Sequence, residues 1–191
     1  MNVLTIDVET THKDRQGGGT TALPYFNNRL VSVGWKWLLN QDVNYEFFYH
    51  KDKDTWYNSE TVNRIQNDLD KTDVLIGQNI KFDIMWLRAC GFKYDGVIYD
   101  TMVAEYLRSK GRRWSLALDA LAKRYNVTQK ETDLVTPYLK EGKTFYDIPA
   151  KIVKEYGIAD VVATEEVALK QLEAFGLTFE ELYEGNIKVI V

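Results

Sequence analysis

Two carboxylates close to the amino terminus, Asp7 and Glu9, are the first residues of this sequence whose types and spacing could do chemistry. They end an apolar, β-branched run that begins at Val3 and is typical of a buried strand. Residues two apart on a strand share a face, so both carboxylates should point together while Ile6 and Val8 pack behind them. Two such anions repel each other unless a cation neutralises them. A divalent metal is therefore one expected partner, and a solvated strand end is the alternative.

Three residues further along the chain could join this pair, and each also has an ordinary structural role. Asp83 suits the first turn of a helix, where the helix dipole favours an acid. Tyr156 and Asp160 lie four residues apart and so share one face of a helix. A further acid, Asp100, is expected to be a helix cap.

Taken in chain order, these residues resemble the three motifs of the DEDD superfamily of exonucleases, in the subclass with tyrosine in the third motif. The motifs read Asp7-x-Glu9-Thr10, Asn79-x-x-Phe82-Asp83 and Tyr156-x-x-x-Asp160. The second motif looks especially like that of the 3′–5′ proofreading domain of bacterial and phage family A DNA polymerases, and residues 99–102 resemble another segment of those domains. The related subclass has a histidine where this chain has Glu155, so the tyrosine subclass is the match.

The resemblance implies a metal-dependent 3′–5′ exonuclease that hydrolyses phosphodiester bonds at the 3′ end of single-stranded DNA, in replication or proofreading, with a phage among the expected sources. Two divalent cations, Mg²⁺ or Mn²⁺, suit hard oxygen ligands. The metal ligands that it implies are Asp7, Glu9, Asp83 and Asp160. Tyr156 completes the catalytic set. A phenol with a pKa of about 10 is protonated at neutral pH and cannot act as a base, so the role implied for Tyr156 is to orient the attacking water together with Glu9.

The substrate-binding residues that the resemblance implies are Thr10, Asn79 and Phe82. A strand end, a turn and a core position describe these three equally well. The sequence departs from the family after the first motif, where proofreading domains have an apolar wedge and this chain has residues 12–15 and three consecutive glycines. Leu23, Tyr25 or Phe26 are the candidates to take that part, and residues 11–28 are expected to form a mobile loop beside the carboxylates.

The rest of the chain must position these residues, and its patterns indicate an α/β fold. Apolar runs predict strands at 3–8, 30–37, 43–49, 74–77 and 97–99. Helical spacing predicts helices at 60–71, 82–90, 101–108, 118–125 with Ser115 as its cap, and 149–175. Gly157 inside the last helix predicts a bend or a close contact. Three antiparallel strands followed by alternating helices and strands predict a mixed sheet flanked by helices, and the resemblance implies that it is ribonuclease H-like.

Composition sets the broad class of the protein. The 191 residues, 45% hydrophobic and 27% charged, fit a single globular domain spanning 1–191. Neither a membrane span nor a signal peptide is visible, and the single cysteine, Cys90, agrees with a reducing compartment, so a cytoplasmic protein is expected. A net charge of −4 argues against broad attraction to nucleic acid, although the cluster Arg108, Lys110, Arg112 and Arg113, with Trp114 beside it, could contact phosphates. A solvated turn is the alternative for that cluster.

Two rival functions stay open at this stage. One is a ribonuclease D-like exonuclease that trims RNA, since the same carboxylates serve both substrates. The other is an inactive exonuclease-like module that only binds nucleic acid, which the retention of four carboxylates and the tyrosine disfavours. A DNA polymerase acting in cis or in trans is the expected protein partner.

Overall fold

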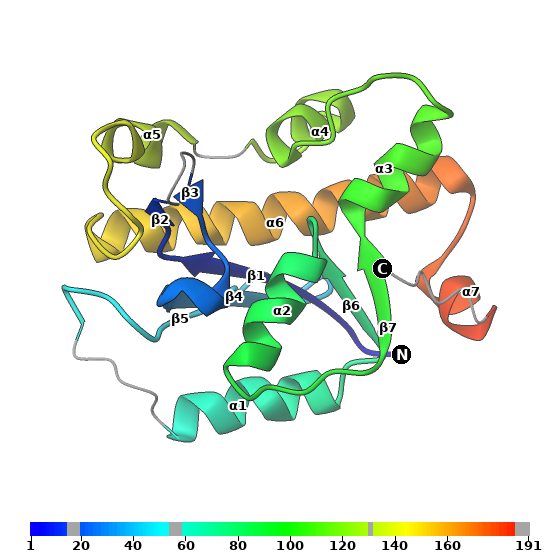
Figure 1. The fold of residues 1–191 in the computed structure, drawn as a ribbon. Coiled ribbons are helices and arrows are strands. Elements are labelled where there is room, and N and C mark those ends of the chain that lie inside the picture. The colour runs from blue at the N-terminus through cyan, green and yellow to red at the C-terminus, as the bar shows by residue number, and fades with distance from the viewer. Residues whose placement is uncertain (15–19, 54–58, 130–131, 186–191) are drawn as a thin grey trace.

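A computed structural model describes residues 1–14, 20–53, 59–129 and 132–185. Its centre is a five-stranded mixed sheet in the order β5-β4-β1-β6-β7 (Figure 1). The strands are β1 Val3–Thr10, β4 Leu30–Trp37, β5 Asn44–Phe47, β6 Val74–Gly77 and β7 Val97–Asp100. Strand β1 pairs antiparallel with β4 and parallel with β6. The predicted α/β class, with three antiparallel strands followed by alternating helices and strands, is confirmed.

Helices cover both faces of the sheet (Figure 1). On one face, α1 Ser59–Asp70 and α2 Lys81–Ala89 share a core with the even-numbered side chains of β1. On the other face lie α3 Thr101–Ser109 and the long helix α6 Ala150–Phe175, which crosses the sheet and contacts β1, β4 and β6. Helices α4 Leu118–Tyr125 and α5 Thr132–Lys140 pack on α6. Helix α7 Phe179–Glu184 follows α6, and within the described residues no helix is long and apolar enough to cross a bilayer.

Residues 11–28, which were predicted to form a mobile loop, contain regular secondary structure in the part that the structure describes. Strands β2 Lys13–Asp14 and β3 Thr20–Thr21 form a small hairpin, and a 3₁₀ turn, η1, spans Pro24–Phe26. The Asn28 amide donates to the carbonyl oxygens of Thr21 and Leu23 and so closes this segment on itself. Residues 15–19, which hold the three glycines, lie outside the described residues. The glycine content of the segment does not indicate these hydrogen bonds, which join residues five and seven positions apart.

Three further details differ from the sequence predictions. Helix α5 was not predicted, because it contains Pro137. Its buried residue Val135 packs in a hydrophobic cluster with Val153 and Tyr156 of α6, a contact that the local sequence does not indicate. Helix α7 was also missed, although Thr178 and Glu181 form a capping box. Ser115 is not the cap of α4, since Ala117 takes that position without a side-chain hydrogen bond. The sequence also allows a final strand at 187–191, a segment that lies outside the described residues.

Candidate active site

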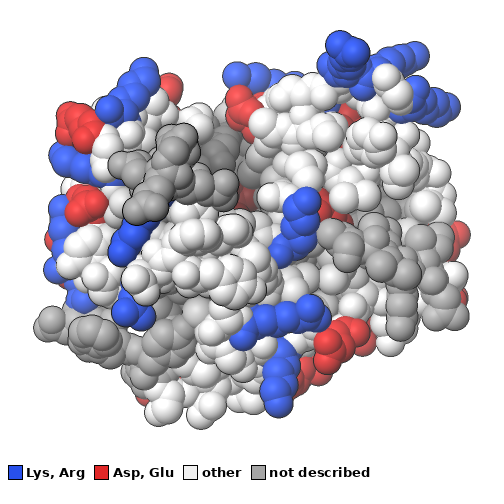
Figure 2. Space-filling view, viewed as in Figure 1, with Lys and Arg blue, Asp and Glu red and all other residues white. Residues whose placement is uncertain are grey.

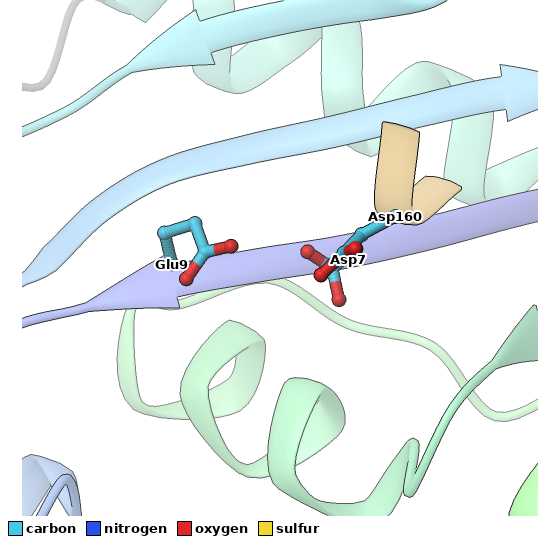
Figure 3. Close-up of side chains that lie close together, drawn as sticks. All are labelled: Asp7, Glu9 and Asp160. Carbon is cyan, nitrogen blue, oxygen red and sulfur yellow. The ribbon is translucent and has the colours of Figure 1, made fainter. Parts of the chain in front are cut away.

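Asp7 and Glu9 lie on the face of β1 that α6 covers, as the alternation of strand side chains requires (Figure 3). Ile6 and Val8 point the other way, into the core with α1 and α2. Glu9 is 8% exposed and Asp7 is half-buried, so both carboxylates are held where water screens their repulsion poorly. The strand thus presents two acids side by side, as its sequence predicts.

Helix α6 brings a third carboxylate to this pair. Asp160 is 3% exposed and extends from α6 toward β1 (Figure 3). One oxygen from each of Asp7, Glu9 and Asp160 lies within 4.8 Å of the other two. Asp160 is about 150 positions from Asp7 and Glu9 in the chain, so only the packing of α6 on the sheet makes the three acids neighbours.

Two glycines allow α6 to approach the sheet this closely. A Cβ at Gly157 would lie 2.4 Å from Cε2 of Tyr45, and one at Gly34 would lie 3.0 Å from Cγ2 of Val161. Gly34 is the β4 residue directly opposite Asp7. Any side chain at either glycine would push the helix away from the strand that carries the carboxylates. The close contact predicted at Gly157 is therefore confirmed.

Tyr45 on β5 is a residue of this region that the sequence reasoning missed. Its ring fills the space beside Gly157, and its hydroxyl donates to the Val153 carbonyl at 3.2 Å and bonds to Ser32 Oγ at 2.7 Å. Burial raises the pKa of Tyr45 well above its usual value, and the nearby negative charge of Glu9 raises it further. The signal in the sequence was the pair of interior glycines, one in a strand and one in a helix, because each marks the close approach of a neighbour.

Asp83 reaches the site from the opposite face of the sheet. Strand β6 ends at Gly77 and its pairing with β1 stops at Thr5, so Val8 has no partner on the β6 side of β1. The Val8 N–H donates to Asp83 Oδ1 at 3.0 Å. Burial raises the pKa of Asp83 well above the usual carboxyl range, and the negative charge of Asp7 raises it further. Asp83 therefore lies next to the other acids but outside their 4.8 Å group.

The start of α2, which fixes the position of Asp83, is held by Asp100 at the end of β7. The Asp100 carboxylate accepts hydrogen bonds from the N–H groups of Asn79 and Ile80 at 3.0 and 3.1 Å. It also accepts from Met102 at 2.8 Å and so caps α3. The predicted role of Asp100 as a cap is confirmed, and the same carboxylate also ties the second motif to the neighbouring strand.

Tyr156 is buried one helical turn before Asp160, on the same side of α6. Burial raises its pKa far above the usual value of about 10. The negative charges of Glu9, Asp160 and Asp7 and a hydrogen bond with the Asp160 side chain raise the pKa further. The phenol therefore keeps its proton at every physiological pH, and it can donate a hydrogen bond but cannot serve as a base.

The donor set fits a hard divalent cation. The three clustered oxygens of Asp7, Glu9 and Asp160 are carboxylate oxygens, the ligands that Mg²⁺ and Mn²⁺ prefer. Buried acids this close together repel, and a cation among them would remove the repulsion. The geometry and the chemistry of the site therefore both allow metal binding.

The residues predicted to bind substrate occupy three separate settings. Thr10 is buried at the irregular end of the β1–β4 pairing. Asn79 has a left-handed backbone, with φ of 56°, which asparagine tolerates better than most residues. Phe82 packs against the core between sheet and α2. Their roles toward a substrate stay predictions.

Among the wedge candidates, the two aromatic residues of η1 are exposed and Leu23 is half-buried. Tyr25 is 78% exposed and Phe26 is 49% exposed. Helix α2 supports this segment, since Trp86 Nε1 donates to the Ala22 carbonyl at 2.9 Å. Aromatic rings on a supported turn can stack on bases. That they grip the 3′ end stays a prediction.

Comparisons with known proteins agree with this architecture. The profile of a family described as 3′–5′ exonuclease matches residues 25–173. No curated protein matched the chain. A solved structure described as the apo form of the nuclease is 17% identical with a TM-score of 0.59, covering 97% of this chain and 75% of its own. Brucella melitensis NrnC bound to pGG is 15% identical with a TM-score of 0.57, covering 99% of this chain and 89% of its own.

Exonuclease X, solved with 5′-overhanging duplex DNA, is 13% identical with a TM-score of 0.51, covering 95% of this chain and 98% of its own. At these identities the structural similarities establish the fold, and the family profile, which spans most of the chain, establishes the family. The chain is an enzyme of the 3′–5′ exonuclease family and carries the motifs of the DEDD superfamily in their tyrosine form.

Proposed function

We propose that this protein hydrolyses phosphodiester bonds at the 3′ end of single-stranded DNA with the help of two divalent cations, Mg²⁺ or Mn²⁺. The observation that carries the proposal is the cluster of three carboxylate oxygens from Asp7, Glu9 and Asp160 within 4.8 Å of one another. Asp83 lies beside Asp7 and extends this acidic group. A site with these ligands needs no serine, cysteine or histidine nucleophile.

The proposed ligand sets follow from which acids are neighbours. Asp7, Glu9 and Asp160 would hold one cation, and Asp7 with Asp83 would hold the other. When bound, the cations supply a water of lowered pKa and neutralise the negative charge that develops on the phosphate and the leaving 3′-oxygen. The Val8 N–H holds Asp83 in place, so that acid does not need the metal to define its position.

Tyr156 and Glu9 would orient the attacking water. The phenol of Tyr156 stays protonated and can donate a hydrogen bond to the water oxygen. Glu9 can accept a hydrogen bond from the same water through its second carboxylate oxygen. In this arrangement Tyr156 and Glu9 would position the water, and the cations would supply its lowered pKa.

Thr10, Asn79 and Phe82 would complete the substrate side of the site. Thr10 directly follows the two acids of the first motif, and its backbone would hold the sugar of the terminal nucleotide. Asn79 and Phe82 precede Asp83 in the second motif and would line the cleft. We also propose that residues 1–191 work as one exonuclease domain in the cytoplasm, in replication or proofreading, with a DNA polymerase in cis or in trans.

An oligoribonucleotide substrate is the second candidate. The structure of NrnC was solved bound to pGG, and that of Exonuclease X with duplex DNA, so proteins of this fold bind differing nucleic acids. Four carboxylates act on the phosphate, which DNA and RNA share, and so do not themselves discriminate between the two.

The deciding experiment uses a 5′-labelled single-stranded DNA oligonucleotide and its RNA counterpart, each with Mg²⁺, Mn²⁺ or EDTA. We expect a metal-dependent ladder that shortens from the 3′ end, faster on DNA. Asp83→Ala should abolish the ladder, whereas Asp95→Ala, which removes an exposed acid paired with Arg88, should not. Faster RNA shortening would select the ribonuclease. Binding of both strands without any cleavage would select the inactive module.

A further inference from the structure

The positive charge of this acidic protein is concentrated in one segment. Residues 101–129 hold six of the 24 Lys and Arg residues but only two of the 28 Asp and Glu residues. This stretch comprises α3, α4 and the turn between them, and Figure 2 shows Lys and Arg side chains gathered over that turn. The six cations are Arg108, Lys110, Arg112, Arg113, Lys123 and Arg124. A chain whose net charge is −4 thus carries a surface of opposite sign.

Two of these cations are used to build the turn. Glu105 is fully buried on α3, and its carboxylate pairs with Arg124 at 2.8 Å and Arg108 at 3.7 Å. Arg124 also donates to the Ser115 carbonyl at 3.2 Å. A buried acid that binds arginines from both helices fixes the path of the chain between them.

Arg124 also takes part, with Arg112, in a second feature of the turn, a contact with an aromatic ring. The guanidinium groups of Arg112 and Arg124 lie 5.4 and 4.9 Å from the centre of the Trp114 ring. Lys110 and Arg113 are exposed, and in the part of the chain that the structure describes neither forms an ion pair. The turn therefore combines uncompensated positive charge with an aromatic ring, the composition of a surface that binds a nucleic-acid backbone.

A hydrogen bond connects this turn to the second motif. The Gln78 side chain donates to the Leu116 carbonyl at 2.7 Å and so connects the turn between α3 and α4 to the residue that follows β6. Strand β6 lies beside β1, and Gln78 immediately precedes Asn79 of the second motif. A strand whose 3′ end lies at the carboxylates can therefore continue toward the turn without crossing the sheet.

We propose that the turn between α3 and α4 binds the phosphodiester backbone of the substrate strand upstream of its 3′ end. The inference rests on the proposed function. It adds a second contact with the substrate, which does not depend on base sequence. Only a strand long enough to extend from the active site to the turn can make this contact. It accounts for how a protein of net charge −4 attracts a polyanion. The metals act at the terminal phosphate, and the turn holds the rest of the strand.

The test compares two substrates with the same 3′ sequence, a trinucleotide and an oligonucleotide of about 20 nucleotides. In the double variant Lys110→Gln/Arg113→Gln, we expect the KM for the long strand to rise roughly 5–10-fold at low salt, with kcat unchanged. The KM for the trinucleotide should not change. Two lost phosphate contacts should also lower the salt slope by about 1.4, so that raising salt from about 50 to 200 mM costs the wild type about 7-fold more affinity than the variant.

The matched control is Lys71→Gln/Lys93→Gln, which removes the same charge from two exposed lysines outside the α3–α4 segment. An equal rise of KM in the control, an equal rise for the trinucleotide, or no rise at all would overturn the proposal. Anisotropy of the labelled long strand in EDTA gives a readout that does not need cleavage. Absence of shortening by the wild type would refute the proposed function, whereas the binding difference between the variants tests the turn separately.

Discussion

The N–H of Val8 donates to the Asp83 carboxylate across 3.0 Å, and Val8 is the residue between Asp7 and Glu9. This hydrogen bond joins the first and second motifs through the backbone, in the place where β6 has already ended. The acids therefore come from both faces of the sheet and meet on its central strand, where β1 extends beyond the end of β6. The Val8 N–H of β1 therefore fixes the position of the Asp83 carboxylate.

Asp83→Asn tests whether this acid serves chemistry or folding. The amide oxygen can still accept from Val8, but a neutral amide is a poor ligand for a divalent cation. We expect exonuclease activity to fall at least about 100-fold, beyond what the loss of a supporting residue costs a metal site. Activity is measured by ladder assay and folding by circular dichroism. Near-normal activity in a folded variant would remove Asp83 from the site.

The same substitution should stabilise the metal-free protein. Because burial and Asp7 raise the pKa of Asp83, the folded state holds its proton more tightly than the unfolded chain does. Stability is therefore lost as the pH rises from about 4 through the folded-state pKa, and asparagine escapes this loss. In EDTA, the melting temperature of Asp83→Asn should exceed that of the wild type by more at pH 8 than at pH 5. A larger gain at pH 5 would contradict the assigned charge state.

Metal binding should be visible without substrate. At a cation concentration of 100 times Kd the folded state gains about 2.7 kcal/mol, which for a domain of this size corresponds to roughly 5–10 °C in melting temperature. We expect Mn²⁺ to raise the melting temperature of the wild type and to have much less effect on Asp160→Asn, which lacks one of the three clustered ligands. Equal shifts in the two proteins would place the metal elsewhere.

Tyr156→Phe should slow hydrolysis about 2–12-fold, much less than loss of a carboxylate, because it removes one hydrogen bond and no metal ligand. The raised pKa of Tyr156 keeps the phenol protonated well above pH 10. The pH–rate profile of the wild type should therefore show no limb from this group, and the variant should follow the same profile up to pH 10. Complete loss of activity, or a limb that disappears in the variant, would mean that the phenol has another role.

Gly157→Ala tests the close approach of α6 to the sheet. Alanine favours a helix by about 1 kcal/mol over glycine, yet its Cβ would lie 2.4 Å from the Tyr45 ring. Overpacking of this kind costs about 1–3 kcal/mol, so we expect a net loss of stability together with lower activity.

A double-mutant cycle identifies Tyr45 as the cause. In a Tyr45→Leu background the ring is gone, and Gly157→Ala should then cost little stability or even raise it, as helix propensity alone predicts. Urea unfolding of the four proteins measures the coupling. The same cost in both backgrounds would show that the glycine serves the backbone of α6 and not its contact with Tyr45.

The sequence by itself determined the local elements and the identity of the chemical groups. The β-branched run that begins at Val3 and the periodicity of residues 149–175 identified β1 and α6, because such patterns repeat over short distances along the chain. The three motifs indicate the exonuclease family without any structural information, and the family profile agrees. Helix α5 could not be predicted from these patterns, since it packs against residues distant in sequence and contains Pro137.

Only the tertiary structure decided how the acids meet. The distance between Asp7 and Asp160 depends on the contact of Tyr45 with Gly157 and on the absence of a side chain at Gly34, which lie on three different elements. The place of Asp83 depends on where β6 stops and on four backbone groups that bind Asp100. These are steric contacts and hydrogen bonds between residues far apart in sequence, and local sequence patterns do not predict them.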